Sequence, residues 1–218
     1  LNAANLAGGS IMDDFDNDGL LDIITSTSDP EGSIAYYHND GDGTFSDYTE
    51  RAGLSGQVGG LNIVQTDYNN DGFLDLLVLR GGWLNEGHPN SLLRNNGDGT
   101  FADVTKQVGI EAPHDGFVGF FFDYDNDGWL DLFVTGWTDD MEEVLQSALR
   151  GTPSQERNRL ALYHNNGDGT FTDVTTQAGL ARTYGAMAAQ YGDVDNDGYL
   201  DIYLGAGAPP MDTYEPNK

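Results

Sequence analysis

DFDNDGLLD, residues 14–22, is the first of four closely similar stretches in this chain of 218 residues. The others are DYNNDGFLD at 67–75, DYDNDGWLD at 123–131 and DVDNDGYLD at 193–201. The four begin at residues 14, 67, 123 and 193, so the period is 53, 56 and 70 residues. A recurrence of this kind is the mark of a repeat architecture.

A second motif alternates with the acidic loop, and its three copies begin at Asn39, Asn95 and Asn165. They read NDGDGTFSDYTERAGL, NNGDGTFADVTKQVGI and NNGDGTFTDVTTQAGL. The Phe of each copy precedes the next acidic loop by 22 residues, whereas the distance from loop to turn varies. Asn-Gly turns are typical of β-hairpins because both residues tolerate positive φ. The rigid part of each repeat therefore runs from turn to loop.

Local patterns within one period are those of strands. Short apolar runs bounded by Gly and Asp follow each loop and indicate buried strands. Further strands are expected before each Asn-Gly turn, in the Thr-Phe-x-Asp segment after it, and at 61–66 and 117–122. Four short strands per repeat predict an all-β fold of β-propeller-type blades, each of four antiparallel strands. We expect about four blades in a single domain over residues 1–218, with a β-solenoid or sandwich as the alternative.

One segment departs from the strand pattern. Residues 139–150, DDMEEVLQSALR, have Asp at the start, Glu in the first turn and Gly151 directly after. These are the signals of a helix of about three turns. The sequence predicts one short inserted helix near 139–150, with an irregular surface loop as the alternative.

Each acidic loop has the residue types of a cation site. Alternate carboxylates at positions 1, 3 and 5, Gly at position 6 and Asp at position 9 can direct oxygens at one centre, with the carbonyl of position 7. The expected ligands of the first loop are Asp14, Asp16, Asp18, Leu20 and Asp22. Those of the others are Asp67, Asn69, Asp71, Phe73 and Asp75, then Asp123, Asp125, Asp127, Trp129 and Asp131, then Asp193, Asp195, Asp197, Tyr199 and Asp201.

These donors predict up to four Ca²⁺ ions. About six to seven hard oxygens suit Ca²⁺, and carboxylates packed this closely repel one another without a cation. Asn69 replaces one Asp, so the second loop should bind most weakly and empty first. Position 4 is Asn in every loop, and Asn tolerates left-handed φ, whereas Leu at position 8 is expected to anchor the loop in the core. An EF-hand is excluded because position 12 is Thr25, Val78, Val134 or Leu204, none of them a carboxylate.

The motif pair resembles a known family. The acidic loops, with Tyr191-Gly192 before the fourth and Gly207-Ala208-Pro209 after it, are similar to the FG-GAP repeat of integrin-alpha-like β-propellers and to bacterial VCBS-type repeats. The NxGDGTFxDVTxxAGL segments resemble proteins that pair such repeats with an UnbV-type domain. The resemblance implies a propeller of about seven blades, with calcium in the hairpin loop between the first two strands of each blade. We therefore expect this chain to form an incomplete propeller, either about half of one or part of a longer chain.

Charge and composition exclude several classes of partner. With 36 acidic residues against 9 basic ones, the net charge is −27, which repels nucleic acid and anionic membranes. No apolar run is long enough for membrane insertion. The absence of cysteine excludes disulfides and thiolate metal sites. Calcium loops suit a calcium-rich compartment, so we expect an extracellular or cell-surface location, with the periplasm as an option.

The remaining chemically active residue types are interpreted as structural. His38 and His164 precede the turn Asn where the middle repeat has Arg94, which favours surface strand positions over ligands. His88 and His114 have no partner at metal spacing. Three acidic residues of the hairpin turns are interpreted as turn formers rather than extra ligands: Asp42, Asp98 and Asp168. The three tryptophans are assigned to packing ahead of a sugar- or peptide-stacking surface: Trp83, Trp129 and Trp137.

No nucleophile motif or phosphate-binding loop is present, so no enzyme activity and no catalytic residue is predicted. The preferred function is a calcium-stabilised extracellular scaffold for recognition of a protein or glycan, adhesion or surface assembly. Partner contacts are expected in the variable segments 25–35, 80–90 and 135–159. The alternative is the propeller of a carbohydrate-active enzyme such as a polysaccharide lyase, and a third reading is self-assembly through open strand edges.

Overall fold

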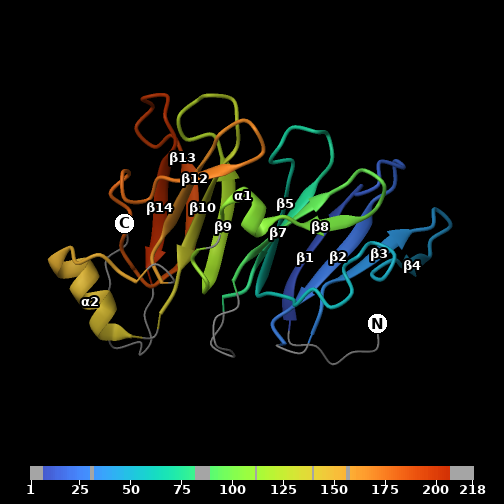
Figure 1. Ribbon diagram of the computed structural model, residues 1–218, viewed down its shortest axis with the longest axis horizontal. Coiled ribbons are helices and arrows are strands. Elements are labelled where there is room, and N and C mark those ends of the chain that lie inside the picture. Colours follow the sequence, from blue (N-terminus) through green and yellow to red (C-terminus); the bar gives the residue numbers. More distant parts are fainter. Residues whose placement is uncertain are drawn as a thin grey trace. The chain divides into compact units, whose positions relative to one another are not determined.

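The computed structural model describes residues 7–29, 32–81, 89–110, 112–138, 140–155 and 158–206. The chain divides into two compact units, Leu1–Thr105 and Lys106–Lys218. Figure 1 shows the elements, which are almost all strands. The Gly207-Ala208-Pro209 motif, Trp83 and His88 lie outside the described residues, as do parts of the variable segments. Neither described helix is long and apolar enough to cross a bilayer.

The first unit contains two blades. Blade 1 is the antiparallel meander β1 (Ala7–Asp13), β2 (Asp22–Thr27), β3 (Ala35–Asn39) and β4 (Phe45–Asp47). Blade 2 repeats it with β5 (Asn62–Thr66), β6 (Asp75–Leu79), β7 (Ser91–Asn95) and β8 (Phe101–Asp103). The acidic loops close the first hairpin of each blade, where Asp13 pairs with Asp22 and Thr66 with Asp75.

The second unit repeats the pattern. Blade 3 consists of β9 (Gly116–Phe122), β10 (Asp131–Gly136), β11 (Ala161–Asn165) and β12 (Phe171–Asp173). Blade 4 is described for two strands, β13 (Ala186–Gly192) and β14 (Asp201–Ala206). A short helix, α1 (Thr105–Val108), follows β8. The prediction of four-stranded antiparallel blades is confirmed, and the expected strands at 61–66 and 117–122 correspond to β5 and β9.

The inserted helix is also confirmed. Helix α2 (Met141–Arg150) lies between β10 and β11. Asp140 is the N-cap, and its carboxylate accepts hydrogen bonds from the amides of Glu142 and Glu143. Gly151 ends the helix in the left-handed conformation at φ 67°. The helix begins two residues after the predicted start because the cap is the second Asp of the pair.

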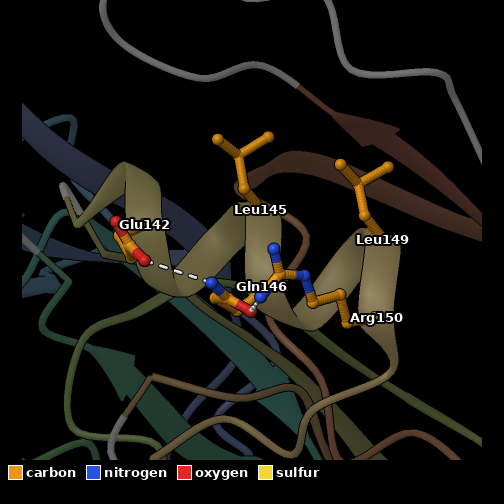
Figure 2. A pocket seen from close by; sticks show the side chains of 5 residues that line it. All are labelled: Glu142, Leu145, Gln146, Leu149 and Arg150. Atoms are coloured by element: carbon orange, nitrogen blue, oxygen red, sulfur yellow. Dashed lines mark hydrogen bonds between the residues drawn. The ribbon is translucent and has the colours of Figure 1, made fainter.

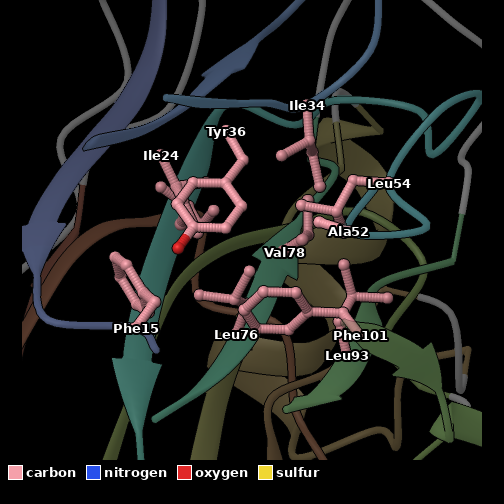
Figure 3. Close-up of a cluster of buried hydrophobic side chains, with 11 residues drawn as sticks. Phe15, Ile24, Ile34, Tyr36, Ala52, Leu54, Leu76, Val78, Leu93 and Phe101 are labelled. Carbon is pink, nitrogen blue, oxygen red and sulfur yellow. The ribbon is translucent and has the colours of Figure 1, made fainter. Parts of the chain in front are cut away.

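Each unit has its own apolar core. In the first unit the core joins blade 1, through Phe15, Ile24 and Tyr36, to blade 2, through Leu76 and Phe101 (Figure 3). In the second unit the core includes Phe133 and Leu162 of blade 3 and Leu204 of blade 4. Neighbouring blades within a unit therefore share one core, and the loop residue Phe15 is part of it at 1% exposure. Packing between blades fixes the position of the acidic loop that carries this residue.

Candidate metal centres

The backbone of all four acidic loops has the same unusual conformation. Position 4 is left-handed in each loop, with φ of 59° at Asn17, 56° at Asn70, 61° at Asn126 and 60° at Asn196. The glycine at position 6 has φ between 87° and 91°, and a Cβ there would meet nothing within 4 Å. The requirement for glycine is therefore one of backbone conformation and not of space. The predicted turn chemistry is confirmed.

Carboxylates at positions 1 and 5 fold the loop around its own amides. In the first loop, Asp14 accepts hydrogen bonds from the amides of Asp18, at 3.0 Å, and Gly19, at 2.9 Å. Asp18 in turn accepts the amide of Leu20 at 2.8 Å. Corresponding bonds occur in the other three loops. These bonds define the path of the loop backbone around its own carboxylates.

The carboxylate at position 9 is the most deeply buried group of the first three loops. Asp22, Asp75 and Asp131 are all 0% exposed. The two oxygens of Asp22 accept hydrogen bonds from the Asn39 amide at 2.9 Å and the Tyr36 hydroxyl at 2.8 Å. This carboxylate thus ties the loop to the third strand of its blade as well as offering a donor for a cation.

Burial makes a charge at position 9 costly. Desolvation raises the pKa of Asp75 to about 7, with smaller contributions from Asp71 and Asp67, although two backbone amides oppose the shift. Desolvation also raises the pKa of Asp131. The pKa of Asp16 is raised by desolvation and by the negative charges of Asp22 and Asp18. A bound cation would offset both burial and mutual repulsion, because it favours the ionised form.

The structure brings most predicted ligands together. One carboxylate oxygen from each member lies within 4.8 Å of the others in three groups: Asp14, Asp16 and Asp22; Asp123, Asp125 and Asp131; and Asp193, Asp195 and Asp197. The donors are all oxygens, the set that Ca²⁺ prefers. In the fourth loop, Asp201 is exposed and lies outside its group. These three loops fit the expected ion.

The second loop differs from the others. Among the described residues it forms no group of three converging carboxylates. The side-chain amide of Asn69 donates instead to Asp71, at 2.8 Å. An amide NH₂ directed at a ligand carboxylate competes with a cation for that oxygen, which agrees with the expectation that this loop binds most weakly.

Positions 7 and 8 were predicted to supply a carbonyl donor and a core anchor. The carbonyls of Leu20, Phe73, Trp129 and Tyr199 stay a prediction. Three of these side chains pack on a glycine of the Asn-Gly turn of the same blade: Phe73 on Gly97, Trp129 on Gly167 and Leu20 on Gly41. The contact is close, since a Cβ added to Gly97 would lie 2.5 Å from the Phe73 ring.

At position 8, Leu74 and Leu200 pack against the cores as expected. Leu21 is 52% exposed, so the prediction of an anchor is wrong for the first loop.

The placement of His38 and His164 beside the acidic loops is the feature of the candidate site that the sequence reasoning missed. The register Ile23↔Tyr37 in blade 1 makes Asp22 and His38 the next cross-strand pair, and Leu132↔Tyr163 does the same for Asp131 and His164. Instead of facing solvent from a strand, each imidazole lies beside the carboxylates of its loop. The signal was the hairpin register, because the residue before the turn Asn must lie opposite position 9.

The other candidate residues have structural roles. Asp42, Asp98 and Asp168 each accept the amide and the hydroxyl of the Thr two residues later, which confirms them as turn formers. Trp137 is 8% exposed and therefore a packing residue. His114 belongs to none of the metal-type groups found in the described residues.

A model of the FG-GAP-like repeat matches the chain at residues 14–78, 80–134 and 148–204. The chain is 29% identical over 153 residues to cartilage acidic protein 1 of Homo sapiens, covering 68% of this chain and 20% of that protein. It is 24% identical over 262 residues to the Mus musculus protein, covering 99% of this chain and 38% of that protein. The chain thus spans well under half the length of these curated relatives.

A solved structure also resembles the chain. It concerns the specific recognition of non-reducing terminal N-acetylglucosamine by an Agrocybe aegerita lectin. The identity is 16% and the TM-score 0.45, with 91% of this chain and 48% of that chain covered.

Proposed function

Because the chain belongs to the family of FG-GAP-like repeat proteins, we propose that it is a calcium-binding, non-catalytic β-propeller scaffold that works outside the cell. The observation that carries the proposal is the convergence of carboxylates in loops at the same place in blades 1, 3 and 4. Calcium has a structural role in this function, since each loop joins the first two strands of a blade and, in blades 1–3, its position-9 carboxylate binds the third strand.

Chemistry and relatives both support an extracellular setting. Loops built from oxygen donors of this kind suit a compartment rich in calcium. The relatives are named cartilage acidic protein, which refers to an extracellular tissue. The net charge of −27 suits a soluble surface that does not adhere to other anionic surfaces.

A binding surface for a protein or glycan partner is supported by the exposed apolar side chains of blade 4. These are Met187, Tyr191, Val194, Tyr199 and Tyr203, with exposures from 42% to 76%. The residue equivalent to Tyr203 in blade 1, Ile24, is 0% exposed, because blade 2 packs on it. Tyr191 packs on Phe120 and Phe122 of blade 3, whereas the register Gln190↔Tyr203 puts Tyr203 on the opposite face of the β13–β14 pair. Tyrosine combines a flat apolar surface with a hydroxyl, so the face that carries Tyr203 suits contact with a partner.

A polysaccharide lyase is less well supported. Binding of acidic sugars needs accessible cations, and the chain has only 9 basic residues, of which Arg80 and Arg159 are committed within the fold. Arg80 donates to the carbonyls of Val58 and Pro89, while Arg159 pairs with Asp173. We therefore keep the scaffold function as the conclusion.

The calcium function is tested by thermal unfolding with and without a chelator. We expect chelation to lower the Tm markedly and added Ca²⁺ to restore it, because an ion that binds the folded chain alone stabilises it by mass action. Mg²⁺ at the same concentration is the control and should restore much less, since it prefers a stricter octahedral shell. A melting curve unaffected by chelation would overturn the proposal.

The weakness of the second loop is tested by Asn69→Asp. The substitution restores a carboxylate and removes the amide that binds Asp71, so calorimetric titration should show the weakest of the calcium steps becoming tighter. Asn70→Asp, at a position that turns the chain rather than ligating, is the matched control and should leave that step unchanged. Equal effects of the two substitutions would show that general charge, and not ligation, sets the affinity.

A further inference from the structure

The loops of blades 1 and 3 have a feature that an oxygen-only calcium site does not need. In blade 1, Nδ1 of His38 lies 3.3 Å from Oδ2 of Asp16 and 3.3 Å from Oδ1 of Asp22. In blade 3, Nδ1 of His164 lies 3.4 Å from Asp125 and 3.2 Å from Asp131. The same imidazole nitrogen thus faces positions 3 and 9 in both blades.

These contacts are poor hydrogen bonds. Nδ1 of His38 and Nδ1 of His164 are buried, and neither makes a hydrogen bond of acceptable geometry with the described residues. A charge-assisted N–H···O⁻ bond is usually about 2.7–2.9 Å long, so separations of 3.2–3.4 Å are longer than is typical of such a bond. A buried nitrogen directed at two carboxylates without bonding to either requires another explanation.

Shared coordination of a cation accounts for the distances. Zinc-type ions bind nitrogen and carboxylate oxygen at about 2.0–2.2 Å in tetrahedral geometry, which separates neighbouring donor atoms by roughly 3.3–3.5 Å. The position-3 and position-9 carboxylates also converge, each offering an oxygen to one group within 4.8 Å. Two further groups include the histidines, and in each of them one ligand atom per residue lies within 4.8 Å of the others: Asp16, Asp18 and His38; and Asp125, Asp127 and His164.

The surroundings hold the donors in place. The imidazole of His38 is only 13% exposed and stacks on Tyr48, with ring centres 4.5 Å apart, while Arg51 lies over the Tyr48 ring at 4.6 Å. Asp22 is fixed by hydrogen bonds from Asn39 and from Tyr36. In blade 3, the Asn165 amide fixes Asp131 at 2.8 Å. Metal ligands are commonly oriented by partners of this kind.

Blade 2 gives an internal comparison. The residue opposite Asp75 is Arg94, as the register Leu76↔Leu93 requires, and position 3 is Asn69. In blade 2, therefore, Arg94 with its permanent positive charge replaces the histidine, and the neutral amide Asn69 replaces the position-3 aspartate. Such a site has neither the imidazole donor nor the negative charge for a second cation, and no three-group cluster forms there among the described residues.

We propose that His38 and His164 are metal ligands that make the loops of blades 1 and 3 mixed nitrogen–oxygen sites for a transition-metal dication of the zinc class. Imidazole with carboxylates suits Zn²⁺ or Co²⁺, whereas Ca²⁺ takes oxygen ligands. Asp16 and Asp22, and likewise Asp125 and Asp131, serve both kinds of ion, so the two compete at these loops. The inference rests on the proposed calcium function only for this competition, and blades 2 and 4 remain calcium sites.

The test uses Co²⁺, whose visible absorption reports nitrogen ligation and low coordination number, in titrations of the full chain. We expect two equivalents of Co²⁺ with a strong visible band, and the loss of two Ca²⁺ equivalents when Co²⁺ is saturating. His38→Gln or His164→Gln should each leave one Co²⁺ equivalent, and the double variant none. His114→Gln, a histidine outside these groups, is the matched control and should retain both.

A gain of binding provides the converse test. Asn69→Asp combined with Arg94→His should add a third Co²⁺ equivalent with the same absorption band. Circular dichroism and the Ca²⁺-dependent Tm establish that each variant folds.

Unchanged Co²⁺ stoichiometry and absorption in the double histidine variant would overturn the inference and leave the calcium function standing. Co²⁺ binding that depends on the histidines, in a chain that binds no Ca²⁺, would overturn the calcium function and support the inference.

Discussion

At the scale of single residues, position 9 of the acidic loop combines two roles. Asp22, Asp75 and Asp131 are fully buried and accept hydrogen bonds from the third strand of their blades, and Asp22 and Asp131 also converge with other carboxylates of their loops. A carboxylate that is held in this way is already in place for a cation, so little ordering is needed when the ion binds. The cost is a buried charge, which the raised pKa of Asp75, about 7, makes visible.

We predict that Tyr36→Phe destabilises the chain by about 1.5–3 kcal/mol, the usual worth of a hydrogen bond to a charged group. The substitution removes the hydroxyl that donates to Asp22 at 2.8 Å and leaves that oxygen short of a partner. Urea unfolding measures the change. Tyr37→Phe, the same substitution on the neighbouring residue of β3, is the control and should cost much less. Equal losses would show that Tyr36 contributes through packing alone.

A pH dependence is expected at the hairpin turns. Hydrogen bonds from the hydroxyl and amide of Thr170 lower the pKa of Asp168. A carboxyl whose pKa is lower in the folded state adds stability above its unfolded pKa of about 3.8, and this stability is lost as the pH falls through the folded pKa.

Thr170→Val should therefore raise the pKa of Asp168 toward its usual value, as followed by NMR titration of the side chain. Thr176→Val, at an exposed threonine in the following turn, should leave it unchanged. A pKa of Asp168 that does not move in Thr170→Val would mean that the backbone amide alone sets the shift.

At the scale of the element, helix α2 is defined by its ends and by one buried face. Val144 and Ser147 are 1% exposed, whereas Leu145 and Leu149 project from the other side at 44% and 78% (Figure 2). On that side a Glu142–Gln146–Arg150 chain of hydrogen bonds runs along the helix at spacings of four residues. Both leucines, with these polar residues, line a pocket on the surface of the variable segment.

Removing the N-cap should loosen this helix selectively. Asp140→Ala leaves the amides of Glu142 and Glu143 without their acceptor, at a cost of about 1 kcal/mol. Hydrogen exchange should become faster in the first turn of α2 and stay unchanged in β9 and β10. Asp140→Asn retains an acceptor oxygen and should behave like the original chain. Faster exchange throughout blade 3 would instead show that the helix and the sheet unfold together.

At the scale of the whole molecule, charge and repeat architecture act together. The chain carries −27 formal charges, and many of them lie in the four loops and the hairpin turns. Repulsion among these groups opposes the compact state, whereas the shared cores between neighbouring blades favour it. Calcium and dissolved salt reduce the same repulsion by different means, one by ligation and the other by screening.

We expect NaCl to raise the Tm of the chelator-treated chain more than that of the calcium-loaded chain. The Debye length falls from about 10 Å at 0.1 M to about 3 Å at 1 M, so repulsion between exposed carboxylates is largely removed. Bound calcium has already neutralised the closest groups, which leaves less for salt to screen. Scanning calorimetry over this range measures both forms, and equal shifts would contradict the expected role of the loops.

Features that depend on near neighbours were predictable from the sequence. The left-handed Asn17, the positive φ of Gly19 and the cap at Gly151 follow from residue type and from contacts within one turn. The alternation of acidic loop and Asn-Gly turn was enough to predict hairpins and hence the four-stranded blades, because strand pairing between adjacent segments is set by these turns.

Tertiary structure alone decided which residues join the loops. The Asn39 amide reaches Asp22 across 17 residues, and Asn165 reaches Asp131 across 34, on either side of a segment of variable length. The same strand pairing places His38 and His164 beside the loops. From the sequence alone, the pattern of His, Arg and His at this position suggested a surface residue instead. The physical reason is that nine consecutive residues form each carboxylate loop, so local sequence is enough to predict it. The residues that contact the loop come from strands distant in the sequence, and their positions depend on strand register and packing.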